Sequence, residues 1–206
     1  DICAVEEARD YLEKVPAENR FLATSCCPSW RMMARRLFPK ESGNISMTYT
    51  PMVYTARMVK EQHPGCKVVF VGPCAAKKLE AMQEELRNDV DFVLTYEELM
   101  GIFEAKNVDL ETIEPDEELK NGTGLGRGFA AAGGVALAVE DVIRKLRPGA
   151  EVKIQRADGL RECRKLLTLA RAGKLDGYLL EGMACPGGCI AGAGTIIAPE
   201  QAAKKL

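Results

Sequence analysis

Eight cysteines are the residues of this 206-residue chain best suited to chemistry, and five of them fall into three compact groups. Those groups are the adjacent pair Cys26 and Cys27, the single Cys74, and the pair Cys185 and Cys189 in "CPGGC". Cysteine thiolates bind zinc, copper(I) and iron–sulfur clusters, so a metal centre is the first chemistry to consider. The remaining three stand alone and are interpreted as core or incidental residues, namely Cys3, Cys66 and Cys163.

Each of the three cysteine groups directly follows a predicted strand. Apolar runs predict these strands at residues 20–24, 66–72 and 177–183, and the run at 66–72 indicates a fully buried strand. In an α/β sheet, the carboxyl ends of parallel strands face a shared crevice in which ligands bind. We therefore expect the three groups to converge at one site.

Helical patterns separate these strands. Apolar residues at spacings of three and four predict helices at 2–15, 29–38, 50–63, 75–86, 96–106, 133–147 and 160–173, with further strands at 90–95 and 151–157. Thr50 is the expected N-cap before Pro51, and Thr95 with Glu98 has the spacing of a capping box. Residues 107–122 are acidic and are expected to form a surface loop. The sequence thus predicts an α/β fold in which mostly parallel strands are flanked by helices.

The composition argues against several kinds of partner. Lys and Arg number 28 against 30 Asp and Glu, with no long block of either sign, so we expect no nucleic acid and no membrane as partner. No apolar run reaches the ~18 residues that cross a bilayer, and the first residues do not resemble a signal peptide. We therefore expect a soluble, cytoplasmic protein.

The cysteine spacing favours a cluster over a single ion. Zinc ribbons carry two closely spaced pairs, whereas this chain has one pair with three intervening residues and takes its other thiolates from distant strands. A 4Fe–4S cubane needs four thiolates, and five are present. Neighbouring residues in an extended chain point in opposite directions, so Cys26 and Cys27 are expected to have different roles. A strained disulfide between them is the alternative.

Lys77 is a candidate cation for the same site. On a helix starting at Pro73, it would project from the same face as Cys74, toward an anionic ligand. Spacing alone leaves open that Lys77 is a solvated surface residue, because the neighbouring Lys78 is equally available.

Three segments, "TSCCPSW", "GPCAAKKLEA" and "EGMACPGGCIAGAG", closely resemble the signature motifs of the catalytic domain of iron-only (FeFe) hydrogenases, in the family's order. The resemblance extends from about Glu7 to Gly194. It implies that residues 1–206 form part of the two-lobed H-cluster domain, without the start of that domain and without accessory iron–sulfur domains. It also implies reversible reduction of protons to dihydrogen, with ferredoxin as electron donor and hydrogenase maturation proteins as partners.

The same resemblance implies a cofactor and the residues that hold it. The family's H-cluster is a 4Fe–4S cubane bridged to a two-iron subcluster that carries CO, cyanide and dithiolate ligands. The positions of the cubane ligands are occupied here by Cys27, Cys74, Cys185 and Cys189. Lys77 corresponds to the lysine that donates to a cyanide, and Met183 and Phe129 correspond to side chains that pack around the two-iron subcluster.

A proton route is implied as well. Cys26 corresponds to the thiol that passes protons, and Glu7 and Ser46 correspond to the relay glutamate and serine. Asp10 stands where the family commonly has a second glutamate, and Gly72 where the best-known enzymes often have methionine. Without the resemblance, Glu7 would be interpreted as an exposed carboxylate on a helix.

Two other functions stay open at this point. One is a hydrogen- or redox-sensing module that uses the same cluster to signal to a partner. The other is a non-catalytic iron–sulfur scaffold, although such a scaffold needs neither Cys26 nor Lys77.

Overall fold

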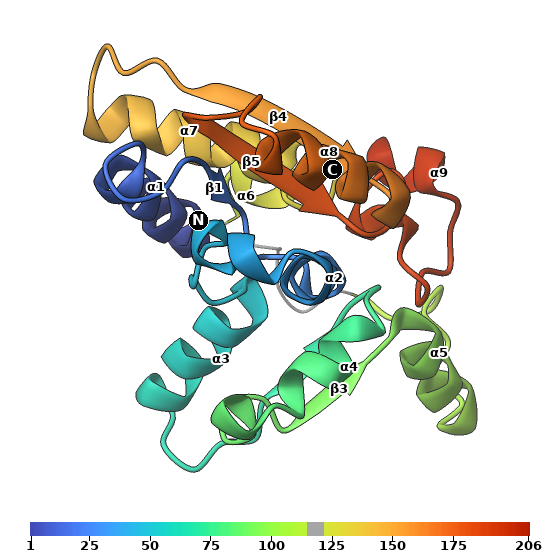
Figure 1. Ribbon diagram of the computed structural model, residues 1–206. Coiled ribbons are helices and arrows are strands. Elements are labelled where there is room, and N and C mark those ends of the chain that lie inside the picture. Colours follow the sequence, from blue (N-terminus) through green and yellow to red (C-terminus); the bar gives the residue numbers. More distant parts are fainter. Residues whose placement is uncertain (115–121) are drawn as a thin grey trace.

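The computed structural model describes residues 1–114 and 122–206, in which five short strands form two separate sheets (Figure 1). The larger sheet has the order β1 (Leu22–Ala23), β5 (Tyr178–Met183), β4 (Lys153–Asp158), and the smaller pairs β2 (Val69–Val71) with β3 (Phe92–Leu94). All pairings between these strands are parallel. The predicted α/β fold with parallel sheets flanked by helices is therefore confirmed, although its strands divide into two sheets.

The central strand β5 is buried on both faces of the larger sheet. The helices that cover this sheet are α1 (Ile2–Lys14), α2 (Pro28–Leu37), α7 (Gly134–Leu146) and α8 (Leu160–Arg171). Leu179 packs against residues of α1 and α7, whereas the next residue, Leu180, packs against residues of α2 and α8. Because successive side chains of a strand point to opposite faces, a strand with helices on both sides is mostly apolar. The exception in β5 is the buried Glu181, whose carboxylate accepts hydrogen bonds from Gly133 N–H (2.6 Å) and Ala136 N–H (2.7 Å) at the start of α7.

The smaller sheet is less buried than the sequence suggested. Its core cluster is formed by Met52, Val53, Ala56, Leu86 and Val90. The prediction of a fully buried strand at 66–72 is wrong, because Val69 is 47% exposed and its cross-strand neighbour Phe92 is 61% exposed. These two residues share one face of the sheet, and nothing in the described part of the chain covers that face.

The helices around the smaller sheet are α3 (Pro51–Gln62), α4 (Ala76–Ala81) and α5 (Tyr96–Ala105). The helix predicted at 75–86 ends at Ala81, and a separate 3-10 turn at Glu84–Leu86 carries Leu86 into the core. The capping box of Thr95 and Glu98 is present. Thr50 does precede α3, but its hydroxyl donates to Glu80 Oε2 (3.3 Å) and caps no helix N–H.

Residues 115–121 of the predicted loop at 107–122 lie outside the described residues, and most of the loop's described residues are exposed. The chain continues with α6 (Gly124–Gly128) and ends near α9 (Pro199–Ala203). None of the helices in the described ranges is long and apolar enough to cross a membrane.

The two sheets are joined where their strands end. In Figure 1, α2 lies between the larger sheet and α4. After β5, the chain crosses to the smaller sheet, where Gly194 N–H donates to Pro73 O (2.9 Å). A Cβ at Gly192 would lie 2.4 Å from Pro73 O, so only glycine allows this close approach. The loops after β1, β2 and β5 are thereby held against one another.

Candidate metal centre

The cysteines that follow β1, β2 and β5 line one cavity between the two sheets, which we call the cysteine cavity. Its wall contains all five grouped cysteines, Cys26, Cys27, Cys74, Cys185 and Cys189. The convergence expected from the strand ends is therefore found, even though Cys74 belongs to a different sheet from the other four. Lys77 and Met183 line the same cavity.

These thiols surround a space and do not meet at a point. Within residues 1–114 and 122–206, no three Cys, His, Asp or Glu side chains are arranged to hold a single metal ion. All eight cysteines are free thiols, so Cys26 and Cys27 are not joined by a disulfide. Thiols spread around a cavity suit a cluster in which each iron takes its own thiolate, whereas zinc needs four ligands at about 2 Å from one centre.

A second cavity of about 210 Å³ adjoins the first. This adjoining cavity shares five residues of its wall with the cysteine cavity: Cys26, Cys74, Lys77, Met183 and Cys189. Phe129 lines only the adjoining cavity, and Cys27 and Cys185 line only the cysteine cavity. The space therefore has two compartments, and Cys189 belongs to both.

The turn at "TSCCPSW" is fixed by Pro28 and Trp30. Pro28 is the first residue of α2, a position where its missing N–H costs nothing, and this makes Cys27 the N-cap. Trp30 is fully buried and its Nε1–H donates to Thr24 O (2.9 Å). Ala184, which follows β5 and also lines the cavity, donates its N–H to Cys27 Sγ (3.4 Å), a contact that would also stabilise a thiolate.

Glycines and one aspartate shape the loop "CPGGC". Gly187 and Gly188 have φ values of 88° and 94°, which L side chains rarely adopt. A Cβ at Gly188 would also lie 2.5 Å from Ala132 N. Asp158, at the end of β4, accepts a hydrogen bond from Gly187 N–H (2.6 Å). These constraints fix the positions of Cys185 and Cys189 relative to the larger sheet.

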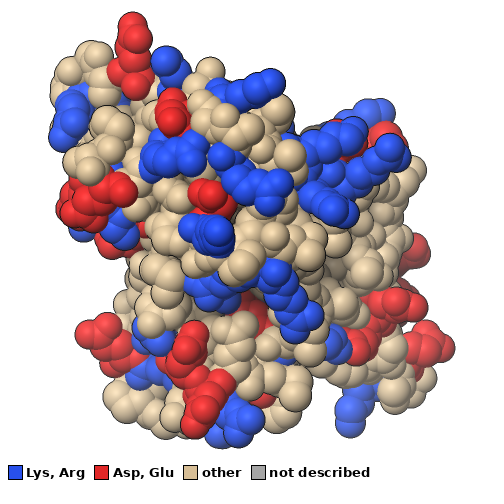
Figure 2. Space-filling model, in the orientation of Figure 1, with Lys and Arg blue, Asp and Glu red and all other residues tan. Residues whose placement is uncertain are grey.

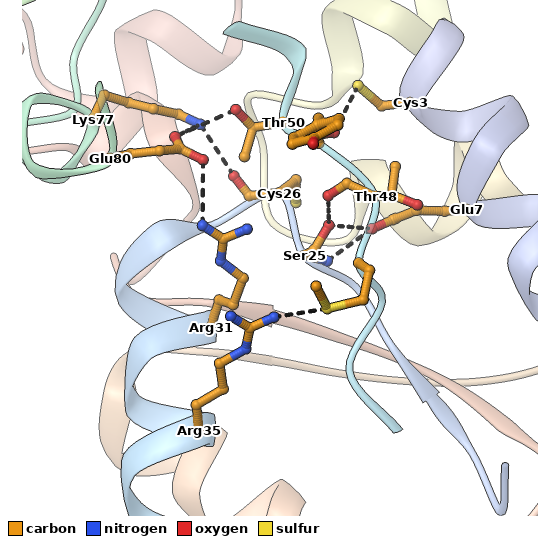
Figure 3. Close-up of polar contacts among 12 residues, drawn as sticks. Cys3, Glu7, Ser25, Cys26, Arg31, Arg35, Thr48, Thr50, Lys77 and Glu80 are labelled. Atoms are coloured by element: carbon orange, nitrogen blue, oxygen red, sulfur yellow. Dashed lines mark hydrogen bonds and ion pairs between the residues drawn. The ribbon is translucent and has the colours of Figure 1, made fainter. Parts of the chain in front are cut away.

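Lys77 is held at the cavity wall by a buried carboxylate. It is 8% exposed, and its Nζ donates to Glu80 Oε2 (2.7 Å) and, over a longer distance, to Cys26 O (3.4 Å). Figure 3 shows that Glu80 also contacts Thr50 and Arg31, the latter at 3.7 Å. The sequence reasoning missed Glu80, although a carboxylate three residues after a lysine on a helix signals such a pair.

The choice between Lys77 and Lys78 is resolved by this geometry. Lys78 points away from the cavity and pairs with Glu98 on α5 (2.5 and 2.7 Å). The helix α4 starts at Ala76 and not at Pro73, so Cys74 lies in the preceding turn, where its carbonyl accepts from Lys77 N–H (3.2 Å).

Glu7 is a buried carboxylate behind Cys26. Its side chain is 1% exposed, so the interpretation as an exposed helix carboxylate is wrong. Its Oε1 accepts hydrogen bonds from Ser25 N–H (2.7 Å) and Ser25 Oγ–H (3.1 Å), and its buried Oε2 has no partner in the described part of the chain. Burial raises the pKa of Glu7 to about 7, although the hydrogen bonds from Ser25 oppose this shift. Figure 3 shows Cys26 between the Lys77–Glu80 pair and the Glu7–Ser25 pair.

Ser46 is buried, but no hydrogen bond in the described residues joins it directly to Glu7. Its Oγ–H donates to Thr48 Oγ1 (2.9 Å), and Ser25 Oγ lies 2.5 Å from Thr48 O. Ser25 and Thr48 therefore stand between Glu7 and Ser46. The sequence reasoning missed Ser25, although it directly precedes Cys26. Asp10 pairs with Lys14, one turn later on α1.

Burial favours the protonated form of three cavity thiols, Cys26, Cys185 and Cys189, by raising the pKa of each. Burial raises the pKa of the Cys26 thiol well above its ordinary value, and the nearby Glu7 carboxylate adds to this effect. Burial also raises the pKa of Cys189 to about 12. Metal binding to such thiols must release their protons, so the affinity for metal depends on pH.

Fold and cavity together define a class of protein: an α/β protein in which five thiols line a cavity between the ends of two parallel sheets. The chain belongs to the family described as iron only hydrogenase large subunit, C-terminal domain, whose model matches residues 1–193.

Its relatives differ in the functions that their names give. The periplasmic Fe hydrogenase large subunit of Nitratidesulfovibrio vulgaris is 26% identical over 244 residues, covering 97% of this chain and 58% of that protein. Cytosolic iron-sulfur assembly component 3 of Bos taurus is 28% identical over 258 residues, covering 98% of this chain and 53% of that protein. The chain thus spans about half the length of these relatives.

A solved FeFe-hydrogenase from Chlamydomonas reinhardtii shares the fold. The TM-score is 0.77 at 23% identity, over 98% of this chain and 69% of the solved one. The chain is therefore a hydrogenase-like domain, and its relatives include proteins named for hydrogenase activity and proteins named for iron–sulfur assembly.

Proposed function

We propose that the protein containing this chain catalyses the reversible reduction of protons to dihydrogen. The observation that carries the proposal is the fifth thiol. Cys26 lines both compartments of the cavity, with the buried Glu7 behind it, and a 4Fe–4S cubane with four thiolate ligands has no need of either group.

The residues present fit the H-cluster that the family binds. Four thiols, Cys27, Cys74, Cys185 and Cys189, surround the cysteine cavity and would hold the cubane. Lys77, Met183 and Phe129 line the adjoining cavity and would contact the two-iron subcluster with its CO, cyanide and dithiolate ligands. When bound, the cluster supplies the electrons and the open iron site at which protons are reduced.

Side chains of the protein would carry the protons to the cluster. Cys26 would pass a proton between the adjoining cavity and the interior, a role supported by its place in the wall of that cavity. Glu7, with a pKa of about 7, would take up and release a proton near neutral pH. Ser46 would form the outer part of this route, with Ser25 and Thr48 in between. Positioned acid–base groups of this kind typically contribute on the order of 10² to 10⁴ in rate.

The proposal includes partners and a compartment. Electrons would come from ferredoxin or from accessory iron–sulfur domains, and maturation proteins would insert the two-iron subcluster. We propose a cytoplasmic location, which the eight free thiols support, although one relative is named as periplasmic.

A non-catalytic iron–sulfur scaffold is the second candidate, because a relative of that kind is as similar as the hydrogenases are. A hydrogen- or redox-sensing module is a third. The scaffold and the sensing module would both keep the cubane ligands. They would differ from the enzyme in turning over hydrogen slowly or not at all.

The test compares two neighbouring cysteines in the matured, full-length protein. Cys26→Ala should retain its iron and lose at least about 100-fold in hydrogen evolution from reduced methyl viologen, because only the proton route is cut. Cys27→Ala should lose cluster iron. Equal iron loss in both variants, or full activity in Cys26→Ala, would contradict the proposal.

A further inference from the structure

Phe70 links the core of the smaller sheet to the adjoining cavity. It lies on β2, lines that cavity and also packs against the core cluster of the smaller sheet. Val69, the residue before it, is on the exposed face of the sheet, so the ring of Phe70 projects from the opposite, covered face. The buried Met52 of α3 likewise belongs both to that core cluster and to the cavity wall. On this side, the wall of the adjoining cavity is therefore part of the packed core, which lies below the surface drawn in Figure 2.

The ring of Phe70 occupies the space beside Gly72. Residues two apart on a strand project from the same face, so a side chain at position 72 would stand next to the ring. A Cβ there would lie 2.7 Å from Phe70 Cε1 and 2.9 Å from Phe70 Cζ. Carbon atoms in contact are optimally about 3.5–4.0 Å apart. A side chain at 72 and the present position of the ring therefore exclude each other.

The backbone itself does not call for glycine at position 72. Gly72 is not among the residues that have a positive φ in the described part of the chain. Its N–H donates to Leu94 O (3.0 Å), which continues the pairing of β2 with β3. The sheet thus holds the backbone in place, and a side chain at this buried position would have to displace the ring of Phe70.

The rest of the wall shows what the ring contributes. The aromatic residues among the described wall residues are Phe70, from the smaller sheet, and Phe129, from the end of α6, which packs against α7. The cavity that they line holds about 210 Å³. Packed protein interiors respond to changes as small as one methylene group. Loss of the ring would therefore enlarge the cavity, and a side chain at 72 would rearrange its wall.

We propose that Phe70 is a specificity-determining residue of the adjoining cavity, and that position 72 is glycine because the ring needs its space. The ring limits the size and fixes the orientation of the ligand that the cavity admits. Under the proposed function, this ligand is a two-iron complex with CO, cyanide and dithiolate ligands. The inference rests on that function for the identity of the ligand, and on the packing of Phe70 against Gly72 for the role of the ring.

The test exchanges the two side chains. G72M adds a long apolar side chain beside the ring, F70A removes the ring, and F70A/G72M does both. The control F92A removes an exposed phenylalanine from the other face of the same sheet, outside the cavity wall. Each full-length variant, with the cubane alone in place, is incubated with a synthetic two-iron complex that carries CO, cyanide and dithiolate ligands. The infrared bands of bound CO and cyanide measure uptake, and the iron content before incubation measures the cubane.

The uptake should follow the space left beside the ring. G72M should take up at least about tenfold less complex than wild type, because an overfilled wall costs binding energy, and F70A/G72M should recover to within about twofold. F70A should take up the complex with broadened CO bands, because the enlarged cavity holds it in more than one orientation. F92A should match wild type in uptake and in band width.

Several results would overturn the inference. These are wild-type uptake in G72M, no recovery in F70A/G72M, and equal effects of F70A and F92A. Sharp, unshifted CO bands in F70A would also overturn it, and this result does not depend on how well G72M folds. A wild type that takes up no complex would contradict both this inference and the proposed function.

Hydrogen evolution by the loaded wild type separates the two proposals. If the loaded wild type yields no hydrogen from reduced methyl viologen, the proposed function fails, and the pattern of uptake still decides the role of Phe70. If hydrogen is evolved but all variants take up the complex alike, only the inference about Phe70 fails.

Discussion

Glu7 illustrates how one buried residue links folding to chemistry. Its carboxyl lies almost fully buried on α1, and a desolvated carboxyl keeps its proton to higher pH than a solvated one. Two hydrogen bonds from Ser25 limit this shift, so the pKa is about 7 and not higher. A group that titrates near neutral pH is well suited to pass protons.

The same pKa predicts how stability depends on pH. Between the ordinary pKa of 4.5 and about 7, folded Glu7 binds a proton that the unfolded chain releases, so stability should fall as pH rises through this window. Glu7→Gln removes the titrating group. From pH 5 to pH 8, wild type should lose on the order of 3 kcal/mol of unfolding free energy relative to Glu7→Gln, measured by urea unfolding.

The exposed Glu13, on the same helix, provides the control for this experiment. Glu13→Gln should follow the wild-type pH dependence. A wild-type slope that Glu7→Gln leaves unchanged would show that Glu7 does not titrate in this range.

At the residue scale, sequence reasoning identified the thiols and Lys77 but not the groups that hold them. Glu80 and Ser25 both lie inside the quoted motifs, yet their roles depend on which atoms meet across the fold. The i, i+3 spacing from Lys77 could have suggested Glu80. No local pattern could have paired Ser25 with Glu7, because 18 residues separate them and the contact depends on how α1 packs.

At the scale of elements, the contact between β5 and α2 sets the shape of the site. Gly182, the residue before Met183, lies against the ring of Trp30, and a Cβ at this position would be 2.2 Å from Trp30 Cδ2. Trp30 is fully buried and fixes the turn that carries Cys26 and Cys27. The glycine in "EGM" is therefore required by packing and not by backbone conformation.

Gly182→Ala should force Trp30 out of its position. Overpacking of this kind typically costs about 1–3 kcal/mol, and the emission of Trp30, the only tryptophan, should shift to the red. Gly101→Ala is the matched control, because a Cβ there meets nothing within 4 Å and helix α5 should gain about 0.5–1 kcal/mol. Urea unfolding followed by fluorescence measures both effects. An unshifted emission with unchanged stability in Gly182→Ala would refute this account of the packing.

Element boundaries were predictable where local signals dominate. The capping box of Thr95 and Glu98 fixed the start of α5, and Pro51 fixed the start of α3. The end of α4 and the exposure of β2 were not predictable, because Leu86 is drawn into a core formed by distant residues and β2 has a neighbour on one edge only. An apolar run is the same in sequence whether one face or both are covered.

At the scale of the whole molecule, the site exists because two sheets end at the same place. The sequence indicated that each cysteine group follows a strand, which is a local property. It could not indicate that β2 belongs to a second sheet, since strand pairing depends on contacts far apart in the chain. The crossing segment with Gly192 and Gly194 brings the loop of Cys74 against the other two.

The central claim is that four thiols from these two sheets hold one cluster. The most direct measurement is iron content per chain, with the spectrum of the reduced cluster, after anaerobic reconstitution with iron and sulfide. Wild type and Cys66→Ser should bind about four irons, whereas Cys74→Ser, which removes the only ligand contributed by the smaller sheet, should lose the cubane signal. A Cys74→Ser variant that keeps the wild-type iron content and spectrum, or a Cys66→Ser variant that loses them equally, would contradict the account.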